Sequence, residues 1–308
     1  RSRRQRQMCI RDRVYIMKKS ICILLSAFLT LSALPLNTFA NDKIIANESK
    51  NGTNYVTVEK SVEENMSNRE KAAVEKFNEL YKNGKIPENI AESELYDIVN
   101  NLVYGELYQQ GQLTDKDREM ISLATLTTLG TTTILKTHVY SALNAGLTPV
   151  EITETVYHCT PYVGAAKSLE AINVVNDVFK EKGIKIPESQ ATVTEESRFD
   201  DGSSAQTKLF GNLGDTKPAE GEVRLGRSFL PDYCFGDFYT RKGLTLEQHE
   251  LLTWVCIATL GGAESQLTGH TNGNKNVGKS KDYMLEVLTD IMPYIGYPRT
   301  LNALNIIN

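Results

Sequence analysis

The chain has 308 residues, 41% of them hydrophobic, which is enough to bury a substantial core. Residues 41–308, which follow a predicted export signal, carry 26 basic and 37 acidic side chains, a net charge of −11. A surface this acidic has no general attraction for nucleic acids or anionic lipids. The composition therefore excludes nucleic-acid binding that relies on a basic surface. No membrane contact is expected once the signal is removed.

Residues 17–40 have the pattern of a signal peptide. A basic start precedes an apolar stretch at residues 21–36, and small residues then lead to Ala40. This order predicts cleavage after Ala40 and an exported protein, periplasmic or secreted. A membrane anchor is the alternative, but the stretch is short for a span of about 20 residues. Residues 1–16 lie upstream of a good start at Met17, and we interpret them as an artefact of the gene model.

The composition also divides the rest of the chain. Residues 41–85 are predicted to form a polar, flexible segment followed by an N-terminal helix over about residues 62–82. Residues 189–225 are rich in small polar side chains and are predicted to be a linker. The linker separates two units, at residues 86–188 and 226–308.

These two units match each other, which predicts an internal duplication. A constant offset through separate blocks is hard to obtain by chance. The matching blocks are residues 104–108 with 235–239 at an offset of 131, and residues 138–146 with 270–278 and 161–164 with 293–296 at 132.

Each unit is predicted to be helical, and sustained strand patterns are absent, so the expected fold class is all-α. In each copy a capping-box pattern opens a long apolar run that ends at glycine, as expected for a buried central helix. The patterns are Thr114 with Asp117 before residues 120–129, and Thr245 with Gln248 before residues 251–260.

Three cysteines remain after the signal: Cys159, Cys234 and Cys256. Their odd number and wide spacing predict neither a disulfide framework nor a zinc knuckle. Cys256 lies in an apolar run and is expected to be buried. A bridge between Cys159 and Cys234 is left open, because exported proteins can form disulfides.

A family resemblance rests on several motifs taken together. The motifs are Arg118-Glu119, His138 and residues 142–148, 151–154 and 161–164 in the first copy, and residues 235–237 and 295–299 in the second. Together they resemble the carboxymuconolactone decarboxylase family, which includes the alkylhydroperoxidases of the AhpD type. The resemblance implies a helical fold, sites between helices and between subunits, and a homo-oligomer, here a trimer of tandem chains.

The resemblance leaves two enzyme activities to compare. Peroxidase members use a Cys-x-x-Cys pair just before the histidine, and a glutamate 19 residues ahead of it, as Glu119 is ahead of His138. The sulfur positions hold Thr131 and Ile134 in the first copy, and Ala263 and Gln266 in the second. Disulfide chemistry needs an attacking thiolate and a resolving thiol, so alkylhydroperoxidase activity is the disfavoured alternative.

A decarboxylase-like lyase acting on a small carboxylated or lactone compound is the leading hypothesis. Such a reaction needs a proton donor for the new carbon, and a histidine suits this role near neutral pH. We expect His138 and His270 to transfer the proton, with Glu119 and Glu250 orienting them. Each pair also has a structural interpretation: a histidine on a helix often has no chemical role, and Glu119 could be a first-turn helix charge.

Binding the substrate carboxylate requires a cation or a dipole. Arg118, Lys167 and Arg299 are the candidates for this role. No metal or organic cofactor is implied, because the four histidines form no ligand-spaced cluster. His158 and His249 have no histidine counterpart in the other copy and are interpreted as incidental.

The second copy departs from the family pattern after its histidine. Residues 271–276 are a poor helix sequence, which predicts a reshaped or loosened pocket beside His270. A non-catalytic small-molecule-binding protein, which kept the fold and lost the chemistry, is therefore the remaining alternative.

Overall fold

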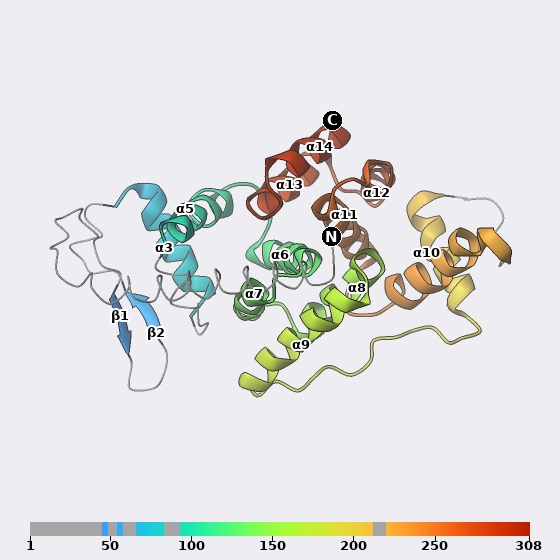
Figure 1. Cartoon of the computed structure of the whole chain (residues 1–308), viewed down its shortest axis with the longest axis horizontal. Helices are drawn as coiled ribbons and strands as arrows, with labels where there is room; N and C mark the ends of the chain where they lie inside the picture. Colours follow the sequence, from blue (N-terminus) through green and yellow to red (C-terminus); the bar gives the residue numbers. More distant parts are fainter. Residues whose placement is uncertain (1–44, 49–53, 58–65, 83–92, 212–219) are drawn as a thin grey trace, which may run out of the picture. The chain divides into compact units, whose positions relative to one another are not determined.

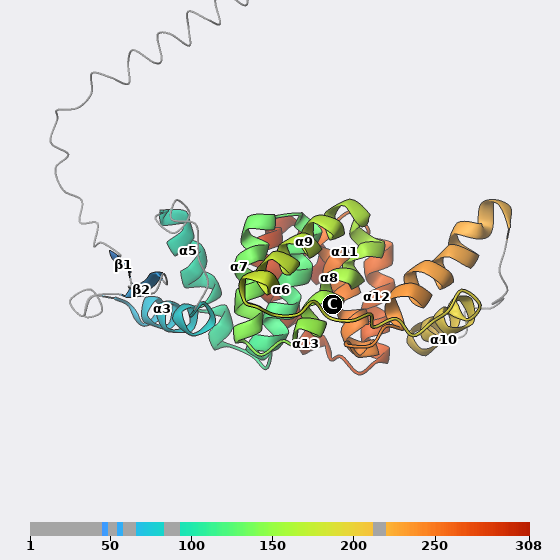
Figure 2. The ribbon, with the colours of Figure 1, turned by 90° about the horizontal axis from the view of Figure 1, so that it is seen from below.

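The computed structural model describes residues 45–48, 54–57, 66–82, 93–211 and 220–308, all within one compact unit, Ile44–Asn308 (Figures 1 and 2). The predicted signal peptide, its cleavage site and the upstream segment lie outside the described residues. Within the described residues, no helix combines the length and the hydropathy that a membrane crossing requires.

A short antiparallel hairpin comes first, formed by β1 (Ile45–Glu48) and β2 (Asn54–Thr57), with Ile45 opposite Thr57. It falls in the segment for which the sequence predicted no regular structure. All other regular elements in the described residues are helices, which confirms the all-α class.

The helices form two successive sets in the same order, and four of the six equivalent pairs have equal lengths. The first set is α3 (Asn68–Leu80), α5 (Glu94–Val103), α6 (Asp115–Leu129), α7 (Thr132–Asn144), α8 (Pro149–Val163) and α9 (Ala165–Glu181). The second set is α10 (Arg198–Phe210), the π-helical η3 (Leu225–Tyr239), α11 (Leu246–Leu260), α12 (Glu264–Asn276), α13 (Lys281–Ile295) and α14 (Tyr297–Ile307). Two single 3-10 turns, η1 (Leu107–Gln109) and η2 (Gly221–Val223), complete the described elements.

The duplication is therefore longer than the sequence blocks indicated, because the predicted linker contains α10. This helix packs against η3 as α3 packs against α5. The equivalence reaches single side chains: Arg69 pairs with Glu106 at 2.7 Å, and Arg198 pairs with Asp237. The linker prediction failed here because the buried face of α10 is short, with Gly202, Ala205 and Leu209 among otherwise small or polar residues. A Cβ on Gly202 would lie 2.0 Å from the Pro231 carbonyl oxygen.

The central helices are α6 and α11, as the sequence predicted. Their capping boxes form at Thr114 and Thr245, and nearly every residue from the first turn onward is buried. In Figures 1 and 2 they lie in the middle of this unit, among α8 and α13. One hydrophobic core includes residues of both copies, so the copies are not separate domains.

The packing between the copies is reciprocal. Helix α6 contacts α13 of the other copy, and its equivalent α11 contacts α8, the equivalent of α13. This is the arrangement of an isologous dimer interface, formed here within one chain. It gives every inter-copy contact a counterpart, and the two candidate sites are built on that relation.

Candidate active site

A histidine and a glutamate meet in each copy, as the sequence predicted. His138 Nδ1 on α7 lies 2.9 Å from Glu119 Oε2 on α6. His270 Nδ1 on α12 lies 2.8 Å from Glu250 Oε1 on α11. Both glutamates are fully buried, so neither is a solvated first-turn charge. The carboxylates accept the Nδ1 proton and leave Nε2 of each ring as the atom that can exchange a proton with a ligand.

A tyrosine hydroxyl is the second partner of each glutamate. Tyr108 donates to Glu119 Oε1 at 2.9 Å, and Tyr239 donates to Glu250 Oε2 at 2.8 Å. Sequence reasoning missed these tyrosines, although both stand at the end of a repeated block. Each carboxylate is thus held between two donors, which fixes the orientation of the histidine ring.

A second tyrosine reaches each histidine from the other copy. The hydroxyl of Tyr294, on α13, is 3.4 Å from His138 Nε2. Its equivalent Tyr162, on α8, has its ring centre 6.4 Å from that of His270. Both belong to the repeated Pro-Tyr-x-Gly block at residues 161–164 and 293–296. Each candidate site is therefore composed of residues from both copies.

The first site is closed by its own tyrosines. Tyr81 and Tyr104 share a hydrogen bond of 2.6 Å, and Tyr81 packs edge-on against His138. With Tyr294 over Nε2, the side chain of His138 is only 4% exposed. Burial raises the pKa of both Tyr81 and Tyr104 well above the usual value, so they remain neutral hydrogen-bonding groups.

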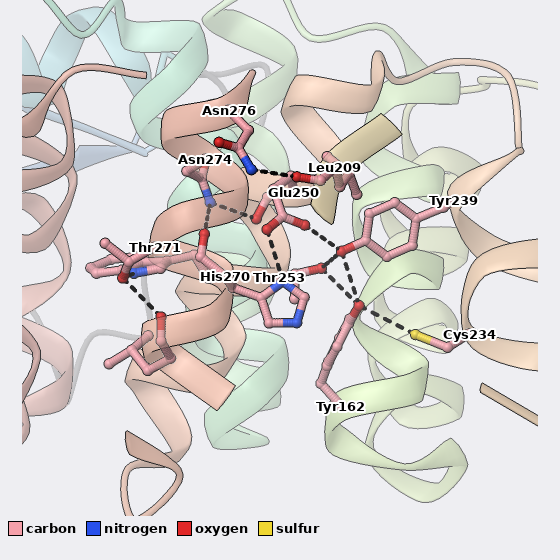
Figure 3. Close-up of polar contacts among 12 residues, drawn as sticks. Tyr162, Leu209, Cys234, Tyr239, Glu250, Thr253, His270, Thr271, Asn274 and Asn276 are labelled. Carbon is pink, nitrogen blue, oxygen red and sulfur yellow. Dashed lines mark hydrogen bonds and ion pairs between the residues drawn. The ribbon is translucent and has the colours of Figure 1, made fainter. Parts of the chain in front are cut away.

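The second site is more open than the first, with the histidine side chain 16% rather than 4% exposed. Phe210 and Phe235 occupy the positions equivalent to Tyr81 and Tyr104 of the first site. The second site therefore has no pair of tyrosine hydroxyls beside its histidine. His270 is 16% exposed, and its Nε2 has no hydrogen-bond partner within the described part of the chain. Figure 3 shows that the Tyr162 hydroxyl instead contacts Thr253, whose hydroxyl donates to it at 2.8 Å.

The segment after His270 is part of the regular helix α12, although its sequence is a poor helix former. Asn274 Nδ2 donates to the backbone oxygens of Glu250, at 3.1 Å, and His270, at 2.9 Å (Figure 3). A Cβ at Gly273 would lie 2.1 Å from Glu250 Oε1, so this glycine allows the carboxylate to approach α12. The residues that weaken the helix sequence are those that fit it to Glu250.

Arg118 does not face a substrate. Its side chain is 2% exposed and binds Asp290 at 2.7 Å and Glu286 at 3.2 Å, both on α13, and it also donates to the Gln110 carbonyl. The prediction of a carboxylate-binding role was wrong because α13 of the other copy brings acidic side chains to this position. Sequence reasoning had no local signal for that contact.

Lys167 and Arg299 occupy equivalent positions away from the histidines. Lys167 Nζ donates to the Thr128 carbonyl oxygen at 2.6 Å, near the C-terminus of α6. Arg299 lies against Gly261 at the end of α11, where a Cβ would be 3.2 Å from its Nε. Cations at a helix C-terminus satisfy free carbonyls and complement the helix dipole. We therefore interpret both as helix-terminating residues rather than substrate ligands.

His158 and His249 were interpreted as incidental, but the structure places them beside the second site. They occupy the positions that Asp290 and Arg118 occupy in the reciprocal contact. Their Nδ1 atoms are 2.9 Å apart, and His158 Nε2 is 2.9 Å from Thr253 Oγ1. Burial lowers the pKa of both, that of His249 to about 4, so both rings are neutral at pH 7.

The comparisons with known proteins agree with this architecture. The family model of the carboxymuconolactone decarboxylases matches residues 93–177 and, separately, residues 228–308. The chain belongs to the carboxymuconolactone decarboxylase family. Two matched segments also support the tandem duplication.

Two similar proteins carry related names. The chain is 29% identical over 91 residues to the 4-carboxymuconolactone decarboxylase of Acinetobacter baylyi, covering 30% of this chain and 68% of the relative. A solved chain described as a gamma-carboxymuconolactone decarboxylase subunit of Burkholderia xenovorans is 19% identical. That similarity covers 77% of this chain and 95% of the solved one, with a TM-score of 0.47.

The cysteines of this family member are poorly suited to thiol chemistry. Cys234 lies 3.4 Å from the Tyr162 hydroxyl (Figure 3), and burial raises the pKa of its thiol to about 11. Cys159 is fully buried, and its contact with Cys256 and burial raise its pKa well above the usual value. The bridge left open between Cys159 and Cys234 is not formed. Neutral, buried thiols are weak nucleophiles.

Proposed function

We propose that this protein is a cofactor-independent decarboxylase and that the second site, at His270, performs the reaction. The observation that carries the proposal is the state of the imidazole. Its Nδ1 is held by the buried carboxylate of Glu250, while its Nε2 has no hydrogen-bond partner among the described residues and the side chain is 16% exposed. A ring oriented at one nitrogen and free at the other is suited to general acid catalysis.

The expected reaction converts a carboxylate and a proton into CO2 and a C–H bond. The bond from carbon to the carboxylate breaks, and its electron pair is delocalised into the neighbouring unsaturated lactone. The Nε2–H of protonated His270 then gives its proton to the carbon that carried the carboxylate. Glu250, hydrogen-bonded at Nδ1, stabilises the imidazolium before this transfer.

The surroundings of His270 favour a small, flat substrate. The Phe210 ring lies edge-on to the imidazole, with the two ring centres 5.3 Å apart. An apolar wall at this distance disfavours a carboxylate more than neutral CO2, which assists the loss of charge. Protonated His270 would supply the positive charge for a carboxylate bound there.

A spectrophotometric assay with γ-carboxymuconolactone tests the proposal on three proteins: wild type, His270→Ala and His138→Ala. Turnover should be lost in His270→Ala and largely retained in His138→Ala, because Tyr294 covers the first histidine. A hydroperoxide with a dithiol serves as the negative control substrate. Full turnover by His270→Ala, or no lactone turnover by wild type, would reject the assignment.

A further inference from the structure

Tyr162 brings a hydroxyl from α8 of the first copy into the second site. Its ring lies edge-on to the imidazole of His270, with the ring centres 6.4 Å apart. The hydroxyl lies 2.8 Å from Thr253 Oγ1, 3.3 Å from the Tyr239 hydroxyl and 3.4 Å from the Cys234 thiol (Figure 3). These three contacts decide whether the hydroxyl has a hydrogen left for a ligand.

The shortest of these contacts does not use the hydrogen of Tyr162. Thr253 is the donor in it, so the Tyr162 oxygen accepts. The hydrogen of Tyr239 can be shared between Thr253 Oγ1, at 2.6 Å, and Glu250 Oε2, at 2.8 Å. Neither of these two neighbouring contacts therefore requires the hydrogen of Tyr162.

Only long contacts remain for that hydrogen among the described residues. A hydrogen bond between two hydroxyls usually spans about 2.5–3.0 Å. Tyr239 and Cys234, the remaining partners, lie at 3.3 and 3.4 Å. Burial raises the pKa of Tyr162 well above the usual value, so the hydroxyl keeps its hydrogen at neutral pH. Tyr162 is therefore a buried donor without a short acceptor, and a ligand oxygen would satisfy it.

The first site shows where a tyrosine at this position lies relative to the reactive nitrogen. There the equivalent Tyr294 has its ring centre 5.9 Å from that of His138, and its hydroxyl is 3.4 Å from Nε2. In the second site the two ring centres are farther apart, and no hydroxyl of the described residues is within hydrogen-bond distance of His270 Nε2. A ligand bound between the Tyr162 hydroxyl and Nε2 can therefore contact both groups.

We propose that Tyr162 is a catalytic residue of the second site and donates its hydroxyl hydrogen to the ring carbonyl oxygen of the substrate. The substrate class is then a lactone whose carbonyl is linked, through a ring double bond, to the carbon that carries the carboxylate. The catalytic role rests on the function proposed for His270, whereas the contact with a ring carbonyl can be tested without turnover.

The contact with the carbonyl oxygen strengthens as the reaction proceeds. When the bond to the carboxylate breaks, CO2 leaves and the electron pair moves through the ring double bond onto the carbonyl oxygen, which becomes an enolate. The Tyr162 hydrogen bond stabilises this negative charge without transferring its proton, and protonated His270 supplies the proton that the carbon gains. A donor aimed at the oxygen where charge develops typically contributes about a hundredfold to a thousandfold to kcat.

The first experiment measures binding by calorimetry, with the full protein and two probes. γ-Butyrolactone-γ-carboxylate has the ring carbonyl but no ring double bond to accept the electron pair, and tetrahydrofuroate lacks the carbonyl. Wild type should bind the lactone about threefold to tenfold more tightly than the ether, and Tyr162→Phe should bind the two alike. Failure of wild type to prefer the lactone, or a preference that persists in Tyr162→Phe, would overturn the proposal.

The second experiment compares the turnover of γ-carboxymuconolactone by Tyr162→Phe and by Tyr157→Phe, which removes a hydroxyl from the same helix. Tyr157 is 37% exposed, and its ring packs against Arg241. The kcat should fall about a hundredfold to a thousandfold in Tyr162→Phe and stay within about twofold in Tyr157→Phe, while KM changes by less than about tenfold. Wild-type kcat in folded Tyr162→Phe would overturn the catalytic role. Absent turnover in wild type would reject the function proposed for His270 and the catalytic role with it, and the binding experiment would still decide the carbonyl contact.

Discussion

The guanidinium of Arg118 on α6 lies 2.7 Å from the carboxylate of Asp290 on α13, and both side chains are only 2% exposed. This ion pair joins the two copies at a position where the reciprocal contact uses two neutral histidines. The same interface therefore exists in a charged form and in a neutral form within one chain. The ion pair lies on the side of the closed site at His138, and the histidine pair lies beside the more open site at His270.

Breaking the ion pair should destabilise the protein strongly. Arg118→Met would leave Asp290 and Glu286 buried without their cation, a change that typically costs about 3–5 kcal/mol. Urea unfolding followed by circular dichroism measures this loss above pH 7, where Asp290 is ionised. Arg118→Met with Asp290→Leu should recover part of the lost stability, because only Glu286 then remains, and it is 18% exposed and still accepts from the Gln112 and Leu113 amides. A single variant as stable as wild type would show that the pair contributes little.

The glutamates should differ in their effect on turnover. Glu250→Gln keeps the size of the side chain but removes the negative charge that stabilises protonated His270, so kcat should fall roughly tenfold to a hundredfold. Glu119→Gln is the matched change in the closed site and should leave kcat near that of wild type. Steady-state kinetics of the two variants, compared at equal folded fraction, measures this difference. An equal loss of kcat in both variants would argue that both sites are active.

Two glycines on α12 provide a matched pair of substitutions. Gly273→Ala would place a Cβ 2.1 Å from Glu250 Oε1, so the carboxylate must move and both turnover and stability should fall. Gly269→Ala meets nothing within 4 Å and should stabilise the helix by about 0.5–1 kcal/mol. Thermal unfolding and lactone turnover of the two proteins test this contrast. Wild-type turnover in Gly273→Ala would mean that the position of Glu250 tolerates displacement.

Lowering the pH should reduce the free energy of unfolding, because the buried histidine pair must then take up protons. Burial lowers the pKa of His249 from 6.5 to about 4 in the folded state, so between these values the unfolded chain binds a proton that the folded chain does not. The stabilisation is complete above pH 6.5 and is lost as the pH falls through about 4, by an amount on the order of 3 kcal/mol. Unfolding free energies measured across this range should fall more steeply for wild type than for His249→Gln.

Asp290 changes the stability with pH in the opposite direction to His249, so its effect needs a separate control. Burial raises the pKa of this carboxyl from 3.8 to about 7, so the folded state binds the proton more tightly. Its contribution is present below about pH 4 and is lost as the pH rises toward 7. The comparison of wild type with His249→Gln should therefore be repeated in an Asp290→Asn background. A pH slope that does not depend on residue 249 there would contradict the assignment.

Local sequence was sufficient wherever the deciding contact spans a few residues. The capping boxes at Thr114, Thr148 and Thr245 all form, because each joins a side chain to the backbone three residues later. The pairing of His138 with Glu119 was also predictable, since adjacent helices joined by a single glycine turn present them to each other. The helix α10 was not, because its packing depends on Gly202 meeting η3, and small polar residues resemble a linker.

The sequence by itself determined the duplication, the helical class and the two histidine–glutamate pairs. Only the tertiary structure decided that Tyr162 and Tyr294 reach across to the opposite copy, and that Arg118 is taken up by Asp290. The physical reason is the range of the interactions. Helix caps and apolar periodicity act within a few residues, whereas these contacts join residues far apart in the chain and depend on how α6 packs on α13 and α11 on α8.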